Sequence, residues 1–327
     1  MSPAPALLFM QRFADWLTAS RVRVIFGAAL LSILALTPLF VSWTPGALIV
    51  LLALRNGAPI AAWYAALISG LTLSWFLLSV GAGPVPALLV AVALIGPPFF
   101  VGRLMARGSS LGLAFQFATL AAIGMLVVVH VVLSDPPGVW SPYVERLAAD
   151  LDRMATMMWN SGSGWHPRDA ELREAASAIV NWGVVAWLLL FNTMAAAAVG
   201  LYAYGRQLGV ARLGPEFRQL QAGRTLAGLA LVATLVSITL RWDFATDASR
   251  LFLGAFVLQG LALLHAARAT LGLSSGWLVG TYVMLFVPVA AWLVQGALVV
   301  FGFLDNWLPF RARLVAARAA MDKGRRG

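Results

Sequence analysis

The sequence predicts an all-α fold, a polytopic transmembrane helical bundle with about eight full spans and one or two short or re-entrant segments. Three observations predict this class. Of the 327 residues, 61% are hydrophobic and 11% are charged, whereas a soluble domain carries about 25% charged residues. The mean hydropathy is +0.85. Apolar runs of about 20 residues, the length of a transmembrane helix, recur along the chain.

The charged residues, cysteines and histidines exclude several classes of protein. The formal net charge is +10, but the arginines stand between the apolar runs, as cytoplasmic anchors do under the positive-inside rule. This placement argues against a nucleic-acid partner. Cysteine is absent and there are three histidines, so we expect no disulfide framework, no metal site and no cofactor.

The N-terminal part is expected to be a transmembrane bundle over 22–133, preceded by a short cytoplasmic leader over 1–21. Prolines interrupt the first apolar run, which is too long for one span, so it is divided into two short spans, of which the second either crosses or re-enters. The expected segments are 22–42, 45–54, 58–81, 84–102 and 109–133.

Residues 134–177 are expected to form an outer-face loop, because they carry seven acids against four arginines. Leu147, Leu151, Met154 and Met158 recur at helical spacing, which predicts an amphipathic helix lying on the membrane surface. A second helix begins near Pro167 and is expected to continue into the next span.

A second transmembrane bundle is expected over 178–304, followed by a basic amphipathic tail over 305–327. The run 276–304 contains Pro288 and is interpreted as a short helical hairpin, with a single tilted span as the alternative. The other spans are 178–204, 225–241 and 251–270. The basic clusters then place both termini in the cytoplasm of a bacterium, with the chain in its inner membrane.

Catalytic motifs are not found. The sequence has no HExxH, no GxSxG and no Walker A loop, so we expect no enzyme activity and no catalytic residues. His166 and three nearby acids could serve a lipid-modifying enzyme, but helix capping explains them equally well. No acid or lysine lies at the centre of a predicted span, which argues against proton coupling through a buried carboxylate.

Polar residues inside the predicted spans are the candidate ligand-binding groups. They would line a cavity for a small solute, or else form hydrogen bonds between helices worth about 1 kcal/mol each. Arg55, at the junction of two apolar runs, either holds an anionic ligand or is a snorkelling cation in a turn. The candidates are Gln116, His130, Asn181, Asn192, Gln259 and Arg55, with His265 and Gln295 as further possibilities.

Two further patterns concern packing and anchoring. Small residues recur every four positions at Ala58, Ala62, Ala66, Gly70 and Ser74, which predicts either internal helix packing or docking to a partner subunit. Near the C-terminus the sequence predicts a membrane anchor, in which an aspartate caps the tail helix, a tryptophan lies at the interface and arginines face anionic lipid. Its residues are Asp305, Trp307, Phe310, Arg311 and Arg313.

These motifs give the chain, over about 30–313, a resemblance to the YybS-like family of polytopic membrane proteins. The ending Gly302-x-x-Asp305-x-Trp307-x-x-Phe310-Arg311-x-Arg313 looks like the closing signature of that family. Gln259-Gly260, Asn192 and the Leu-Arg55-x-Gly57 junction are similar as well.

The resemblance implies a helical bundle whose N-terminal part is similar to the substrate-binding S-components of energy-coupling-factor transporters. Such components bind a vitamin or metal at the outer face and dock on a coupling protein through small residues of an early helix. The expected function is therefore a solute-binding transporter subunit that needs a separate ATPase module. The alternative is a non-transporting membrane scaffold or regulatory protein, with membrane lipids as its surroundings in either case.

Overall fold

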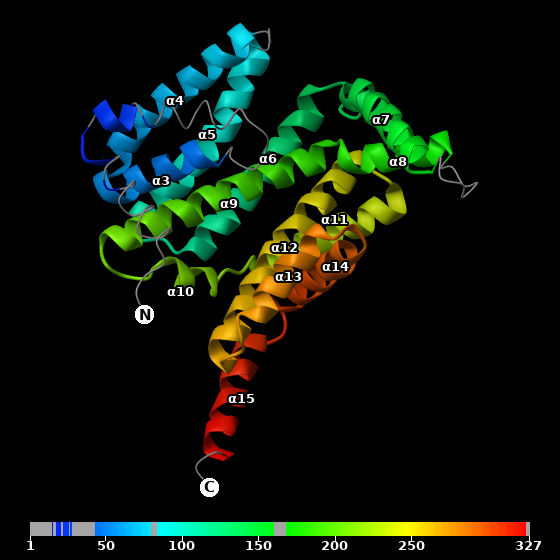
Figure 1. The fold of residues 1–327 in the computed structure, drawn as a ribbon. Helices are drawn as coiled ribbons and strands as arrows, with labels where there is room; N and C mark the ends of the chain where they lie inside the picture. Colours follow the sequence, from blue (N-terminus) through cyan, green and yellow to red (C-terminus); the bar gives the residue numbers. More distant parts are fainter. Residues whose placement is uncertain are drawn as a thin grey trace. The chain divides into compact units, whose positions relative to one another are not determined.

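The computed structural model describes residues 15, 18–20, 22–25, 27, 43–79, 84–159 and 168–324. Within these ranges the chain is helical, with turns and short loops and no strand (Figure 1). The expected leader and the expected span 22–42 lie mostly outside them. The described helices form two compact units, which are taken separately below.

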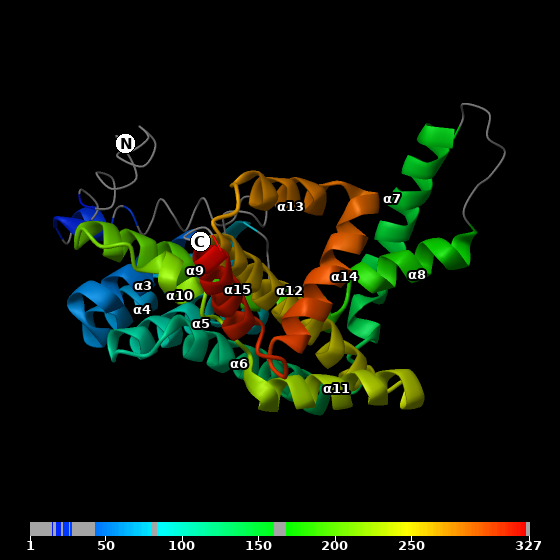
Figure 2. The ribbon, with the colours of Figure 1, turned by 90° about the horizontal axis from the view of Figure 1, so that it is seen from below.

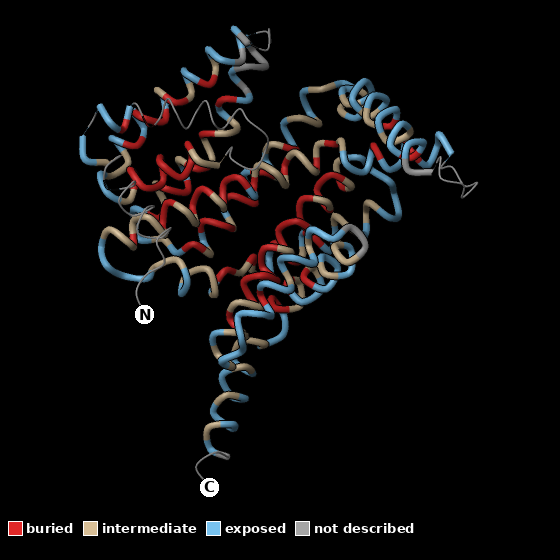
Figure 3. Tube along the Cα trace, viewed as in Figure 1, coloured by how far each residue is buried: buried red, intermediate tan, exposed pale blue. Residues whose placement is uncertain are grey.

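Unit 1 contains Met1–Leu120, Leu189–Ala227 and Ala255–Gly327. Its centre is helix α3 (Thr44–Asn56), whose residues from Pro45 to Ala53 are all buried. Helices α4 (Ala58–Ser79) and α5 (Pro84–Ala106) pack on α3 and on each other. Because α3 has 13 residues, it is about 20 Å long and shorter than a membrane core. The short segment expected over 45–54 is therefore confirmed as a short, enclosed helix (Figure 3).

The rest of unit 1 comes from later parts of the chain. It takes the first part of α6 (Leu111–Val132), the last part of α9 (Trp182–Gln207), α10 (Leu213–Phe217), the start of α11 (Gly223–Leu240) and most of α12 (Asp243–Leu271). The C-terminal helices are α13 (Gly276–Phe286), α14 (Pro288–Leu304) and α15 (Phe310–Gly324). Figure 2 shows α14 leaving the end of α13 in a new direction, so the expected break near Pro288 is confirmed.

Unit 2 contains Ala121–Leu188 and Gly228–Gly254. Its own elements are η1 (Gly138–Trp140), α7 (Ser141–Trp159) and α8 (Asp169–Ile179). The expected amphipathic helix is present as α7, and its apolar residues Leu147 and Leu151 pack against Leu172 of α8. Its place on the membrane surface stays a prediction. Met154, from the same predicted face, is exposed. The apolar stripe thus divides between a helix pair and the surface.

The helix expected to run from the outer loop into the next span is also interrupted. Helix α8 ends at Ile179, Val180 is extended, and α9 begins at Trp182. The side chain of Asn181 accepts a hydrogen bond from the Val184 amide at 2.9 Å. This is the N-cap contact that starts a new helix, and it explains the break physically.

The expected helical membrane bundle is confirmed in its general form. Five described stretches are long and apolar enough to cross a membrane, and four shorter apolar helices accompany them. The total of about eight full spans and the cytoplasmic position of the termini stay predictions. The five long stretches are Ala58–Trp75, Leu111–Val132, Asp169–Gln207, Gly223–Leu240 and Asp243–Leu271.

Candidate functional site

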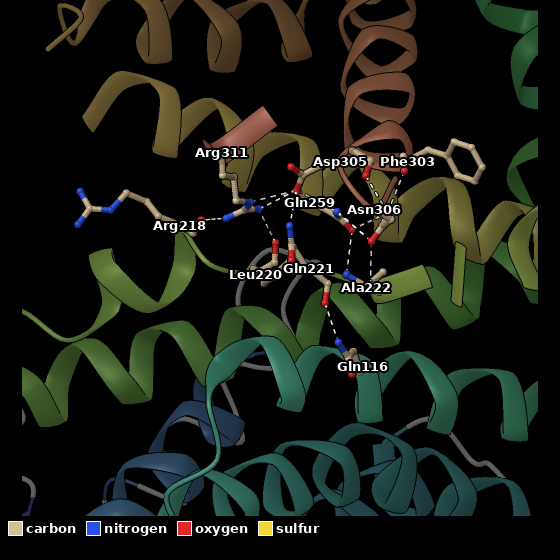
Figure 4. A network of polar contacts seen from close by, with 12 residues as sticks. Gln116, Arg218, Leu220, Gln221, Ala222, Gln259, Phe303, Asp305, Asn306 and Arg311 are labelled. Atoms are coloured by element: carbon tan, nitrogen blue, oxygen red, sulfur yellow. Dashed lines mark hydrogen bonds and ion pairs between the residues drawn. The ribbon is translucent and has the colours of Figure 1, made fainter. Parts of the chain in front are cut away.

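Gln259 of α12 is the centre of a polar network in unit 1 (Figure 4). The residue is fully buried. Its Oε1 accepts a hydrogen bond from the backbone amide of Ala222 at 2.9 Å. Its Nε2 donates to Asp305 Oδ2 at 3.2 Å and to Asn306 Oδ1 at 3.3 Å. One glutamine therefore joins α12, the loop before α11 and the end of α14.

Asp305 and Arg311 form the charged part of this network. The Asp305 side chain is 1% exposed, and its Oδ2 lies 2.9 Å from Arg311 Nη2. Arg311 also donates through Nε to the same oxygen at 3.2 Å, and to the backbone carbonyls of Arg218 and Leu220. Gln221 Nε2 donates to Asp305 Oδ2 at 3.1 Å. A carboxylate so deeply buried requires partners of this kind.

This geometry corrects the expected anchor motif. Asp305 does not cap the tail helix, because it ends α14 while α15 begins at Phe310. Arg311 is not available to anionic lipid as expected, because its guanidinium forms an ion pair with the buried Asp305. Trp307 and Arg313 are exposed, as a membrane-interface role requires.

The start of α11 is held by the end of α14. Asn306 Oδ1 accepts a hydrogen bond from the Gly223 amide at 2.8 Å, which satisfies one of the amides that a helix N-terminus leaves open. Gly223 has a φ of 83°, a conformation that glycine adopts at little cost. Arg224 Nε donates to the carbonyl of Asn306 at 3.4 Å.

Two glycines let α12 and α14 approach closely enough for this network to form. A Cβ on Gly260 would collide with the backbone carbonyl of Leu298, and a Cβ on Gly302 would collide with that of Phe256. Small residues at such crossings are typical of membrane helices. The pair Gln259-Gly260 and the ending from Gly302 to Arg311, far apart in sequence, therefore meet in one place.

A cavity of about 340 Å³ opens beside this network. The sequence after α14 provides most of its wall, and Gln221 and Arg224 provide the rest. The wall combines two arginine side chains with an apolar surface of tryptophan, leucine, proline and phenylalanine. The residues from the C-terminal part are Asp305, Asn306, Trp307, Leu308, Pro309, Phe310 and Arg311.

The structure brings only some of the predicted ligand-binding residues together. Gln116 Nε2 donates to the Gln221 carbonyl at 3.0 Å and thereby borders the Gln259 network. Asn192 is buried in α9 of the same unit. Arg55 is exposed and donates to the Thr18 hydroxyl.

His130 and Asn181 belong to unit 2, where they are used locally. Asn181 Nδ2 donates to the carbonyls of Ser177 and Ala178 at 3.0 Å, in addition to its capping contact. His130 Nδ1 lies 3.0 Å from the Leu126 carbonyl, and its Nε2 lies 3.4 Å from Asp247 Oδ2.

Asp247 is the buried acid that sequence reasoning missed. Helix α12 begins at Asp243, and Asp247 is buried in its second turn. Its Oδ1 lies 3.3 Å from Arg250 Nη1, one helical turn later. The sequence signal for this acid was an aspartate and an arginine three residues apart, directly before an apolar run, which is the spacing of an ion pair on one helix face. Gln221 and Asn306 were missed as well, because a loop amide carries no periodic pattern.

Helix α4 has an exposed face, which carries the small-residue stripe, and a buried face. Ala62, Ala66, Gly70 and Ser74 are exposed, and Ala58 is half-buried. The buried face consists of Ala61, Tyr64, Ala65, Ile68 and Thr72. The stripe is therefore not explained by packing within the described part of the chain.

Comparisons of the chain with protein-family models, with curated proteins and with solved structures find no match.

Proposed function

We propose that the chain is a non-transporting membrane scaffold whose working surface is helix α15. The observation that carries this proposal is the use of Gln259, Asp305 and Arg311 inside the fold, at the base of α15. Gln259, a candidate solute-binding residue, is here bonded to Asp305 and Asn306. The effect of these bonds is to fix the point from which α15 extends (Figure 1).

The surface of α15 suits a protein partner that is acidic and partly apolar. Only positions at a spacing of about four, such as Leu314 and Arg318, are half-buried, and most of the helix is exposed. Val315 is 61% exposed and contributes apolar surface to the helix. Arg311 is paired with Asp305, and Arg318 with Asp322. The exposed cations Arg313 and Lys323 form no ion pair among the described residues, so they give the free surface of the helix its positive charge. Charge of one sign on an exposed helix favours complementary partners.

A second candidate function is the transporter subunit that the family resemblance implies. The exposed stripe on α4 favours it, because small residues let a partner helix approach the backbone closely. In that case a coupling subunit with an ATPase would dock on Ala66 and Gly70. The intramolecular bonds of Gln116, Asn181 and Gln259 make the solute-binding part of this candidate the weaker one.

One cross-linking experiment separates the two candidates. The chain has no cysteine, so single cysteines can carry a photoreactive maleimide in native membranes. Val315→Cys tests α15 and Ala66→Cys tests the α4 stripe. The matched controls are Val279→Cys, equally exposed on α13, and Ile60→Cys, exposed on another side of α4.

The scaffold proposal predicts a protein adduct from Val315→Cys that the Val279→Cys control does not give. Adding Arg313→Glu should abolish that adduct, since it reverses the charge beside the reactive position. An adduct from Ala66→Cys with an ATPase-associated coupling subunit, and none from Val315→Cys, would overturn the scaffold in favour of the transporter subunit. Lipid adducts alone from all four positions would refute both.

A further inference from the structure

The cavity at the junction of α14 and α15 contains an uncompensated cation. Of its two arginines, Arg311 is neutralised by Asp305. Arg224 is exposed, donates to the Asn306 carbonyl through Nε, and forms no ion pair among the described residues. The charged side chains of the wall therefore leave one positive charge, carried by a guanidinium whose terminal nitrogens face no carboxylate.

Arg224 lies where one apolar helix begins and another ends. Helix α11 starts at Gly223 and continues as an apolar stretch long enough to span a membrane, and the apolar α14 finishes at Leu304. The hydrogen bond from the Gly223 amide to Asn306 Oδ1 holds these two ends together. Where an apolar helix spans a membrane, its ends lie at the level of the lipid headgroups. Trp307, 47% exposed beside them, is the residue type enriched at that level.

We propose that this cavity binds the phosphate group of an anionic phospholipid headgroup, with Arg224 as its main ligand. A guanidinium presents paired N–H donors that match two phosphate oxygens. The N-terminus of α11, an 18-residue helix, adds partial positive charge at the same point. Leu308, Pro309 and Phe310 supply the apolar wall that the glycerol backbone and the first acyl carbons would contact.

The size of the cavity fits this ligand class. Its volume of about 340 Å³ is at the lower end of the range for small-molecule sites. It is therefore suited to a headgroup and not to a whole lipid. The proposal stands apart from the role of α15, since neither Val315 nor Arg313 lines the cavity.

The test is a titration of the full chain with phosphatidylglycerol, in which native mass spectrometry counts the bound lipids. Arg224→Gln removes the side chain proposed to bind the phosphate. Arg313→Gln removes the same charge from an exposed position outside the cavity. We expect Arg224→Gln to weaken the tightest phosphatidylglycerol site by roughly 10- to 100-fold, as for the loss of a charge-assisted contact. Arg313→Gln should change it by less than about twofold. Arg224→Lys should weaken it to a lesser degree than Arg224→Gln, because the charge is kept and the paired geometry is lost.

Two results would overturn the proposal. Equal weakening by Arg224→Gln and Arg313→Gln would show binding by overall charge. Competition by free glycerol 1-phosphate at concentrations equal to the lipid would show a site for soluble phosphate esters and not for lipid. Thermal unfolding of each variant is measured as a control for folding. If Arg224→Gln is unstable, the comparison is made with Arg224→Lys, which is expected to unfold at the same temperature as the unmodified chain.

Discussion

Replacing Arg311 by glutamine should strongly destabilise the chain, because it breaks a buried ion pair. The substitution leaves the Asp305 carboxylate, 1% exposed, with two neutral amide donors from Gln221 and Gln259 in place of its ion pair. The carbonyls of Arg218 and Leu220 lose their donor at the same time. Breaking a buried pair from one side typically costs about 3–5 kcal/mol.

The partner substitution should be milder, which makes the pair suitable for a double-mutant cycle. Asp305→Asn leaves Arg311 bonded to two carbonyls and 23% exposed, so we expect a loss of about 1–2 kcal/mol. The double variant replaces both charges by amides and should cost about 2 kcal/mol. The cycle should therefore show a coupling energy of at least about 2 kcal/mol between the two residues.

The free energy of unfolding can be measured in mixed micelles by titration with a denaturing detergent, followed by circular dichroism. Arg313→Gln, which removes an equal charge from the exposed side of α15, should change it by less than about 0.5 kcal/mol. Additive losses in the cycle, or equal losses in Arg311→Gln and Arg313→Gln, would refute the assignment of a buried pair.

Three further changes test the packing of the fold. Gly260→Ala should destabilise by about 1–3 kcal/mol because its Cβ meets the Leu298 carbonyl, whereas Gly296→Ala in α14 has open space and should be neutral, as thermal unfolding would show. Asn181→Ala removes the N-cap of α9 and should cost about 0.5–2 kcal/mol, with Asn181→Asp losing less; equal losses in the two variants would contradict the cap. Leu172→Ala should increase hydrogen exchange in α7 and α8, and uniform exchange across the chain would contradict a local helix pair.

Hydropathy was sufficient to predict the helices, but the polar contacts depended on which helices meet. The run around Pro288 and the span ending near Val132 follow from residue type and length alone. The partner of Gln259 could not be predicted in this way, because Ala222 contacts it through a backbone amide, and every residue except proline has such an amide. Arg311 looked like a surface cation for the same reason, since its neutralising acid precedes α15 and turns inward.

The enclosed position of α3 has a consequence for how the chain is made. Helix α3 packs closely against two later helices. Gly46 of α3 lies beside Pro98 of α5 and Ala196 of α9, and Val50 of α3 lies beside Gly102 of α5 and Gly200 of α9. The ribosome reaches α9 only after about 140 further residues, which takes roughly 7–30 s at 5–20 residues per second. During that time α3 has left the ribosome but has no complete binding site in the protein. Its short apolar surface must then be held by lipid or by the insertion machinery, so delayed synthesis of α9 would expose the nascent chain to misassembly and proteolysis.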